Sequence, residues 1–194
     1  MSHYTSLSWA AMPAQLPLAK LNARTKLSWN EPARMVLDNF SDQDPLHVHT
    51  STKLKHADAI MDGAGARYIC VFDHQQRLTG VLALRDLHGR QAVRLAKELS
   101  IAHDDLSVDY LMKPISQLPL ITYQQLERAR IGDVVATLQK SGQDFLLVQE
   151  EGQIVGLVSS LNIVERTGES VQVRHHVESF VDILHAIKHS DDIE

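Results

Sequence analysis

The sequence repeats one pattern twice, and this repeat limits what the chain can fold into. The first copy runs from Tyr68 to Asp73, crosses a short polar turn and continues through Leu78–Leu84. The second runs from Phe145 to Gln149, turns at Glu150-Glu151-Gly152 and continues to Ser159. Continuous apolar runs bounded by turn residues are typical of strands that are buried on both faces. The repeat therefore predicts two similar units, each with a strand hairpin.

The segments around each hairpin repeat as well. A short extended piece and a helical pattern precede it, and the helical pattern stops at glycine. A further helical stretch follows it. In chain order these segments are Leu46–His49, Leu54–Met61 and Arg85–Leu87 in the first copy, and Leu118–Thr122, Ile131–Leu138 and Ser160–Val164 in the second. The sequence thus predicts a mixed α/β (α+β) fold made of two β-α-β-β-α units.

The rest of the chain falls outside the repeat. We expect an N-terminal extension over residues 1–34, with Trp9 and Trp29 anchored against the core. Unit 1 spans 35–103 and includes a linker helix over about 90–102, and unit 2 spans 104–167. Residues 168–194 form a predicted amphipathic helix, because apolar side chains recur there on one face. These are Val173, Val177, Phe180, Val181 and Leu184.

Composition excludes several classes of protein. The net charge of −5 argues against a nucleic-acid binder with a basic surface. No run approaches the roughly 18 apolar residues of a membrane span, and the first residues lack the pattern of a secretory signal. We therefore expect a cytoplasmic protein. The single cysteine, Cys70, excludes an intramolecular disulfide and a Cys-rich zinc site, and its apolar surroundings indicate a small buried residue.

In its repeated stretches the chain resembles a tandem CBS-domain pair, also called a Bateman module. Val108–Pro114 is similar to the helical entry of a CBS unit, and the resemblance covers roughly residues 35–167. The other matching stretches are Ala66–Asp73, Leu78–Leu87, Phe145–Val148 and Gly156–Ile163. The resemblance implies two units about a pseudo-twofold axis, two clefts between their sheets, a homodimer, and regulation of an effector protein, with no catalysis.

The family's ligand signature is a glycine, a hydroxyl residue three positions later and an aspartate six positions later. Glycine allows a close approach of the backbone, the hydroxyl holds a phosphate at a helix start, and the aspartate accepts both donors of a ribose diol. The corresponding residues are Gly80, Ala83 and Asp86 in copy one, and Gly156, Ser159 and Asn162 in copy two. Each copy therefore lacks one element of the signature.

Base recognition, as the resemblance implies it, uses two groups of residues. These are His49, Thr50, Tyr68 and Ile69 in the first cleft, and Ile121, Thr122, Phe145 and Leu146 in the second. Tyr68 and Phe145 equally fit as core aromatics. Arg85 either pairs with a phosphate or is a surface arginine. Asp86 and Ser159 fit equally as helix caps.

The leading hypothesis is a regulatory module that binds AMP, ADP or ATP, with S-adenosylmethionine as a further family ligand, and acts on an unknown effector protein. If the first cleft reads the ribose, Asp86→Ala should weaken binding by roughly 1–3 kcal/mol. One alternative is a dimerisation scaffold without a ligand. The other is a metal-dependent enzyme using His47 with His49, or His185 with His189, which are four apart on the predicted C-terminal helix. No nucleophile elbow, P-loop or dinucleotide motif supports an enzyme.

Overall fold

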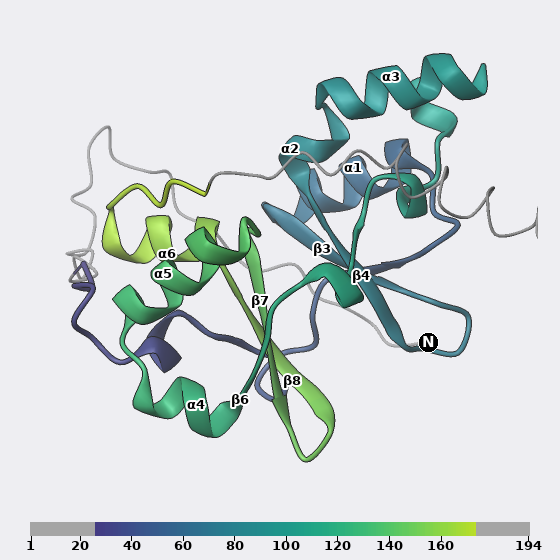
Figure 1. The fold of residues 1–194 in the computed structure, drawn as a ribbon. Coiled ribbons are helices and arrows are strands. Elements are labelled where there is room, and N and C mark those ends of the chain that lie inside the picture. The colour runs from purple at the N-terminus through teal and green to yellow at the C-terminus, as the bar shows by residue number, and fades with distance from the viewer. Residues whose placement is uncertain (1–25, 174–194) are drawn as a thin grey trace, which may run out of the picture.

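The computed structural model describes residues 26–173, and in this range the chain forms two sheets of four strands each. The strands of the two units lie next to each other in the middle of Figure 1, with α5 and α6 on the far side from α1 and α3. The strand order is β2-β3-β4-β5 in one sheet and β1-β8-β7-β6 in the other. The predicted mixed α/β fold is confirmed.

Unit 1 contains the first predicted hairpin and its helices. Its elements are β2 (His47–His49), α1 (Leu54–Ala64), β3 (Tyr68–Phe72), β4 (Leu78–Ala83), α2 (Leu84–Leu87) and α3 (Arg90–Leu99). The strand β2 runs parallel to β3, which is antiparallel to β4. The helix α1 stops at Gly65, whose φ of 62° is a left-handed conformation that glycine adopts without strain.

Unit 2 has the same order of elements. They are β6 (Leu120–Thr122), α4 (Tyr123–Arg128), α5 (Ile131–Ser141), β7 (Phe145–Glu150), β8 (Gln153–Ser159) and α6 (Ser160–Thr167). The hydroxyl of Thr122 accepts from the backbone N–H of Gln125, and the Gln125 side chain accepts from the backbone of Thr122. This capping box fixes the start of α4. The helix α5 ends at Gly142, again left-handed.

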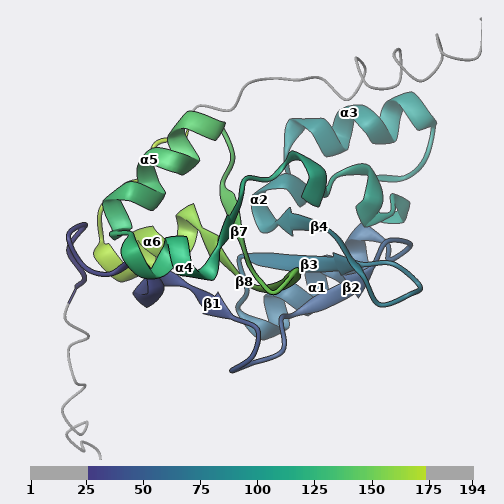
Figure 2. The same ribbon diagram turned by 60° about the horizontal axis from the view of Figure 1, so that its bottom comes forward.

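Each sheet is completed by a two-residue strand from the beginning of the other unit. The strand β1 (Asp38–Asn39), at the beginning of unit 1, pairs antiparallel with β8 of unit 2, and Figure 2 shows the two side by side. The strand β5 (Lys113–Pro114), at the beginning of unit 2, pairs antiparallel with β4 of unit 1. Short 3-10 helices lead into these strands and out of β5, at Ala33–Val36, His103–Asp105, Val108–Tyr110 and Ile115–Gln117. The hydrogen bonds of the sheets therefore cross the predicted boundary between the units.

Three apolar clusters hold these layers together. One lies between the helices and sheet of unit 1 and includes Leu54, Ile69 and Leu82. A second lies in the same place in unit 2, and the partly buried Trp29 packs against it, as predicted. The third joins the two sheets face to face. Its buried members are Val81, Ala83, Leu118, Phe145, Leu147 and Leu157. The hairpin strands are therefore covered on both faces, because helices pack on one side and the other sheet packs on the second.

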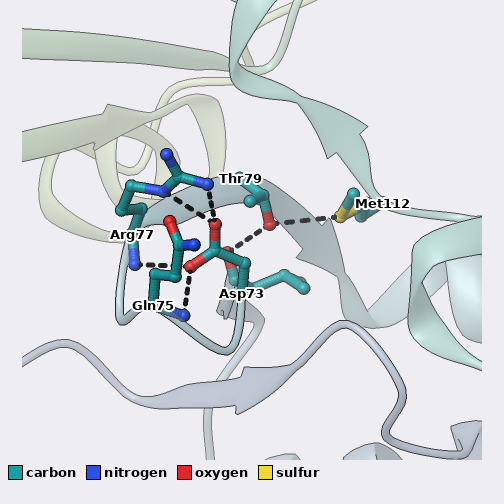
Figure 3. A network of polar contacts seen from close by, with 6 residues as sticks. Asp73, Gln75, Arg77, Thr79 and Met112 are labelled. Atoms are coloured by element: carbon teal, nitrogen blue, oxygen red, sulfur yellow. Dashed lines mark hydrogen bonds and ion pairs between the residues drawn. The ribbon is translucent and has the colours of Figure 1, made fainter.

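The turn between β3 and β4 is fixed by one carboxylate (Figure 3). Asp73 accepts hydrogen bonds from the backbone N–H groups of Gln75 and Arg77 at 2.8 and 2.9 Å, and from Arg77 Nε at 2.8 Å. These donors, the Arg77 N–H first among them, lower the pKa of Asp73. Thr79 donates to the Val71 carbonyl oxygen at 2.9 Å, which ties the end of the turn back to β3.

The ends of the chain are described only in part. Trp9 and most of the predicted C-terminal helix lie outside the described residues, while residues 168–173 contain no helix or strand. The predicted linker helix is present as α3. Within residues 26–173 no helix has both the length and the apolar character needed to cross a membrane.

Candidate functional site

A pocket of about 660 Å³ opens where three segments that are distant in sequence meet. The segment 37–46, which contains β1 and leads into β2, forms one wall. The turn at 64–68 between α1 and β3 forms the second. The third is the first two turns of α6 with Ser159 before it. The pocket therefore joins the α1–β3 corner of unit 1 to the β8–α6 corner of unit 2.

The Asp38 carboxylate is held at the wall of this pocket by two donors. Tyr68 Oη donates to Asp38 Oδ2 at 2.7 Å, and Asn162 Nδ2 donates to Asp38 Oδ1, also at 2.7 Å. Burial, followed by the negative charge of Asp38, raises the pKa of Tyr68 far above its ordinary value, so the phenol keeps its proton and remains a donor. Both oxygens of the Asp38 carboxyl group therefore act as acceptors.

A second set of bonds fixes Asn162. Its Nδ2 also reaches the Val36 carbonyl oxygen at 3.3 Å, and its Oδ1 accepts from Arg166 Nε at 3.1 Å. Arg166 Nη1 donates to the Met35 carbonyl oxygen at 2.7 Å. Asn162 stands where the ligand signature has aspartate, and here it positions a carboxylate that β1 supplies. The site therefore contains the acceptor that copy two lacks in sequence.

The start of α6 faces the same pocket. Ser159 is buried, and its hydroxyl accepts from the backbone N–H of Asn162 at 3.0 Å, so it caps the helix. Gly156, three residues earlier, lies against β1. A Cβ at Gly156 would come within 2.7 Å of the Asp38 carbonyl oxygen. Gly80 is in the same position against β5, where an added Cβ would lie 2.9 Å from the Lys113 carbonyl oxygen. Both glycines make room for the short strand that the other unit adds to the sheet, here called the exchanged strand (β1 or β5). From the sequence, both were predicted to make room for a ligand.

The place that corresponds to the pocket when the two units are interchanged lies between the β4–α2 corner of unit 1 and the α5–β7 corner of unit 2, and an ion pair joins these two corners. Tyr68 pairs with Ala83 in unit 1 as Phe145 pairs with Ser159 in unit 2. By this register Asp144 corresponds to Arg67, and Arg85 corresponds to Leu161. Arg67 and Leu161 both line the open pocket, whereas the Arg85 guanidinium is bonded to the carboxylate of Asp144.

The Arg85–Asp144 pair is reinforced from unit 2. Asp144 is buried, its Oδ1 accepts from Ser160 Oγ at 2.8 Å, and its backbone carbonyl oxygen accepts from the Ser160 N–H at 2.8 Å. Arg85 also lies 3.8 Å from Asp86. The two walls that stay apart at the open pocket are therefore bonded directly to each other at this corner.

The predicted site residues are brought together in a different grouping from the one expected. Tyr68, Ser159 and Asn162 line the pocket, so residues from different copies meet there. Asp86, which was predicted to share a cleft with Tyr68, is on α2 of unit 1 and is not among the residues that line this pocket, so its contact with a ligand stays a prediction. Strand pairing within unit 1 places Tyr68, at the start of β3, opposite the end of β4. The residues that complete the pocket around Tyr68 nevertheless come from unit 2.

Seven further predicted residues lie elsewhere. Ile69 and Leu146 are fully buried in the helix-facing cores, and Phe145 is buried edge-on against Tyr68 with ring centroids 5.7 Å apart. Of the remaining four, His49 ends β2 and Thr50 follows it, while Ile121 and Thr122 are the last two residues of β6, paired with the second half of β7. The pocket is at the Leu46 and Tyr68 end, so the parallel register places these four at the opposite end of the sheets.

Sequence reasoning missed Asp38, Arg67 and Arg166. Asp38 precedes the repeat as the sequence shows it, and a two-residue strand has no periodicity to detect. One signal was available. Strand register matches Asp38 with Lys113, so Val36-Leu37 corresponds to Leu111-Met112 in the entry segment of unit 2. The same apolar pair therefore precedes both exchanged strands.

The predicted histidine sites find no metal geometry in the described part of the chain. His47 and His49 lie on one face of β2, where His47 meets the Phe72 ring edge-on and His49 stacks on His74 with centroids 5.5 Å apart. No group of three or more His, Cys, Asp or Glu side chains within residues 26–173 is arranged to hold a metal ion. His185 and His189 lie outside these residues.

No protein-family model and no curated protein matches the chain. Solved structures do. An uncharacterized conserved protein from Pyrococcus horikoshii is 17% identical, with a TM-score of 0.53 over 75% of this chain and 98% of its own. A hemolysin-like protein containing a CBS domain, from Oenococcus oeni, is 14% identical, with a TM-score of 0.52 over 73% and 93%.

A third structure is the CBS domain of a bacterial CNNM/CorC-family Mg²⁺ transporter in complex with ATP. It is 14% identical to this chain, with a TM-score of 0.50 over 73% of this chain and 89% of its own. Each likeness spans nearly the whole of the matched structure. The predicted fold of a tandem CBS-domain pair is therefore confirmed.

Proposed function

We propose that this protein is a regulatory module that binds an adenosine-containing ligand in the pocket between its units and so modulates an effector protein. The Asp38 carboxylate carries the proposal. Each of its oxygens accepts one internal hydrogen bond and keeps a second lone pair for the hydroxyl donors of a ribose. The ATP-bound transporter domain, which shares the fold, supports this class of ligand.

The remaining pocket residues suit the rest of such a ligand. Leu37, Leu46, Ala66 and Leu161 offer apolar surface to a base, while the backbone of the 64–68 turn offers polar groups beside it. A concave site with apolar walls and a few fixed polar groups is typical of small-ligand pockets. The proposal assigns binding to these residues and no catalytic step.

We further propose one ligand for each chain. At the corresponding corner, Arg85 and Asp144 are bonded across the space that separates Leu161 from Arg67 in the open pocket. A ligand there would have to separate a buried carboxylate from its cation, which costs several kcal/mol. We therefore assign the ligand contacts to Asp38, Tyr68 and Asn162, in place of the predicted contacts with Gly80, Arg85 and Asp86. The homodimer, the effector protein and the cytoplasmic location stay predictions from the sequence.

Isothermal titration of the full-length, ligand-stripped protein tests this proposal. With adenosine, AMP, ATP and S-adenosylmethionine as titrants, we expect at least one to bind with a stoichiometry of one per chain. Asp38→Ala should weaken that binding by about 1–3 kcal/mol, the size of a lost hydrogen bond to a charged group. The matched variant Asp86→Ala, which removes a carboxylate outside the pocket, should leave the affinity within about a factor of two.

Three results would count against the proposal. If none of the four compounds binds to folded protein, as judged by circular dichroism, the ligand proposal fails and a scaffold role takes its place. If Asp86→Ala weakens binding and Asp38→Ala does not, the site lies at the other corner. A stoichiometry of two would contradict the closure by Arg85 and Asp144.

A further inference from the structure

We infer that the pocket selects a ribonucleoside whose 5′ group carries no negative charge, and so discriminates against phosphorylated nucleotides. This inference rests on the proposed function and specifies the ligand of the same pocket. It starts from the charged side chains that line the pocket. Four are carboxylates and two are guanidinium groups, namely Asp38, Asp42, Asp44, Glu165, Arg67 and Arg166. The pocket therefore presents net negative charge to whatever enters it.

Two of the groups that would hold a phosphate, Ser159 and Arg166, are already engaged, so the exposed guanidinium of Arg67 is left to face the four carboxylates. Ser159 is the hydroxyl that the signature assigns to a phosphate, but it is 1% exposed and its Oγ accepts from the Asn162 N–H. Arg166 donates to the Met35 carbonyl oxygen and to Asn162 Oδ1. A phosphate could reach the buried Ser159 hydroxyl only if the residues around it moved, and it would have to share Arg166 with two internal acceptors.

For a ribose, unlike a phosphate, the pocket holds suitable hydrogen-bonding partners. Its hydroxyls are donors, and the two Asp38 carboxyl oxygens are acceptors held in place by Tyr68 and Asn162. The exposed carboxylates of Asp44 and Glu165 add repulsion toward an anion but none toward a neutral nucleoside. The same pocket thus favours the sugar and disfavours the phosphate, and each added phosphate increases the repulsion.

The experiment is a titration of the ligand-stripped full chain with adenosine, AMP, ATP and 2′-deoxyadenosine at low and high salt. We expect adenosine to bind tightest, with ATP weaker by about tenfold or more at low ionic strength, because its phosphates and the pocket carboxylates carry like charges that repel each other. Because salt screens this repulsion, the gap should narrow as the salt concentration rises. Removal of the 2′-hydroxyl should weaken binding severalfold through the loss of a bond to Asp38.

A double variant isolates the charge. The side chains of Asp44 and Glu165 make no hydrogen bond or ion pair with another described residue, so Asp44→Asn with Glu165→Gln removes two charges and no side-chain contact of that kind. This variant should bind AMP and ATP at least about threefold more tightly and leave adenosine unchanged. The control, Glu127→Gln with Glu150→Gln, alters the net charge equally but lies on α4 and β7, away from the pocket.

The outcomes separate this inference from the proposal beneath it. AMP or ATP binding more tightly than adenosine to the unaltered protein would overturn the phosphate discrimination and leave the adenosine-ligand proposal standing. Equal effects of the two double variants would also overturn it, because the pocket carboxylates would then have no special role. If neither these four compounds nor S-adenosylmethionine binds, both proposals fail.

Discussion

The guanidinium of Arg85, on α2 of unit 1, is bonded to the carboxylate of Asp144, just before β7 of unit 2. Asp144 is buried while the Arg85 side chain is about half exposed, so the arginine reaches inward from the surface to neutralise a charge at the junction of the units. This pair joins one corner of the two units, and the other corner is left open as a pocket.

Removal of the cation should therefore destabilise the protein. We expect Arg85→Leu, which introduces the residue found at the equivalent position 161, to lower the free energy of unfolding by about 1–3 kcal/mol, because it leaves a buried carboxylate without its cation. Urea denaturation measures the change. The control is Arg77→Leu at the exposed Arg77–Asp73 pair, where less than about 1 kcal/mol is expected. Equal losses from the two variants would contradict this account.

A methyl group at Gly156 should displace β1 from its place beside β8. The added Cβ would lie 2.7 Å from the Asp38 carbonyl oxygen, which is backbone and has little room to move. We expect Gly156→Ala to cost about 1–3 kcal/mol of stability and to weaken ligand binding with it, since Asp38 moves with the strand.

Gly63→Ala provides the comparison for that variant. Gly63 is inside α1 with nothing within 4 Å of an added Cβ, so alanine there should stabilise the protein by about 0.5–1 kcal/mol. Thermal melts of the two variants should shift in opposite directions. A Gly156→Ala protein as stable as the unaltered one would show that β1 is not tightly held.

The Cys70 thiol should be unreactive while the protein is folded. It is fully buried in β3, and burial, with a further contribution from the charge of Asp38, raises the pKa of the thiol to about 12. The thiolate is the reactive form, so at pH 8 very little of it is present. Iodoacetamide labelling followed by mass spectrometry should give no adduct in buffer and one adduct in denaturant. Rapid labelling of folded protein would place Cys70 at the surface.

Protonation of His103 should stabilise the fold. Its Nε2 lies 2.8 Å from the Leu87 carbonyl oxygen and its Nδ1 lies 3.2 Å from Asp104 Oδ1. Both partners are acceptors, so only the imidazolium can donate to both, and these contacts, the Leu87 bond first, raise the pKa of His103. The resulting stability is fully present below the ordinary pKa of about 6.5 and is lost as the pH rises through the higher folded value.

Urea midpoints at pH 6 and pH 8 measure this contribution. We expect His103→Gln to reduce the loss of stability that accompanies the rise from pH 6 to pH 8. His56→Gln, at an exposed histidine of α1, is the matched control for the loss of an imidazole elsewhere on the surface. If the His103 variant keeps the full dependence, another group is responsible for it.

The sequence by itself determined the two units and their order of elements. Apolar runs in β3, β4, β7 and β8, together with the glycines that stop α1 and α5, are local patterns that a single stretch of chain specifies. The repeat then predicted that both stretches fold alike, and the structure confirms it. The same local patterns identified Ser159 at the start of α6, where it serves as the helix cap.

Only the tertiary structure decided how the site is assembled. The bond from Asn162 to Asp38 joins residues 124 positions apart, and β1 is too short to have a periodicity of its own. The ion pair of Arg85 with Asp144 likewise spans 59 positions and the two units. Which carboxylate reaches the pocket, and which corner is closed, depends on the exchange of β1 and β5 between sheets. That exchange pairs each two-residue strand with a strand distant in sequence, so local periodicity does not predict it, and the apolar pair before each strand gains its meaning only from the observed register.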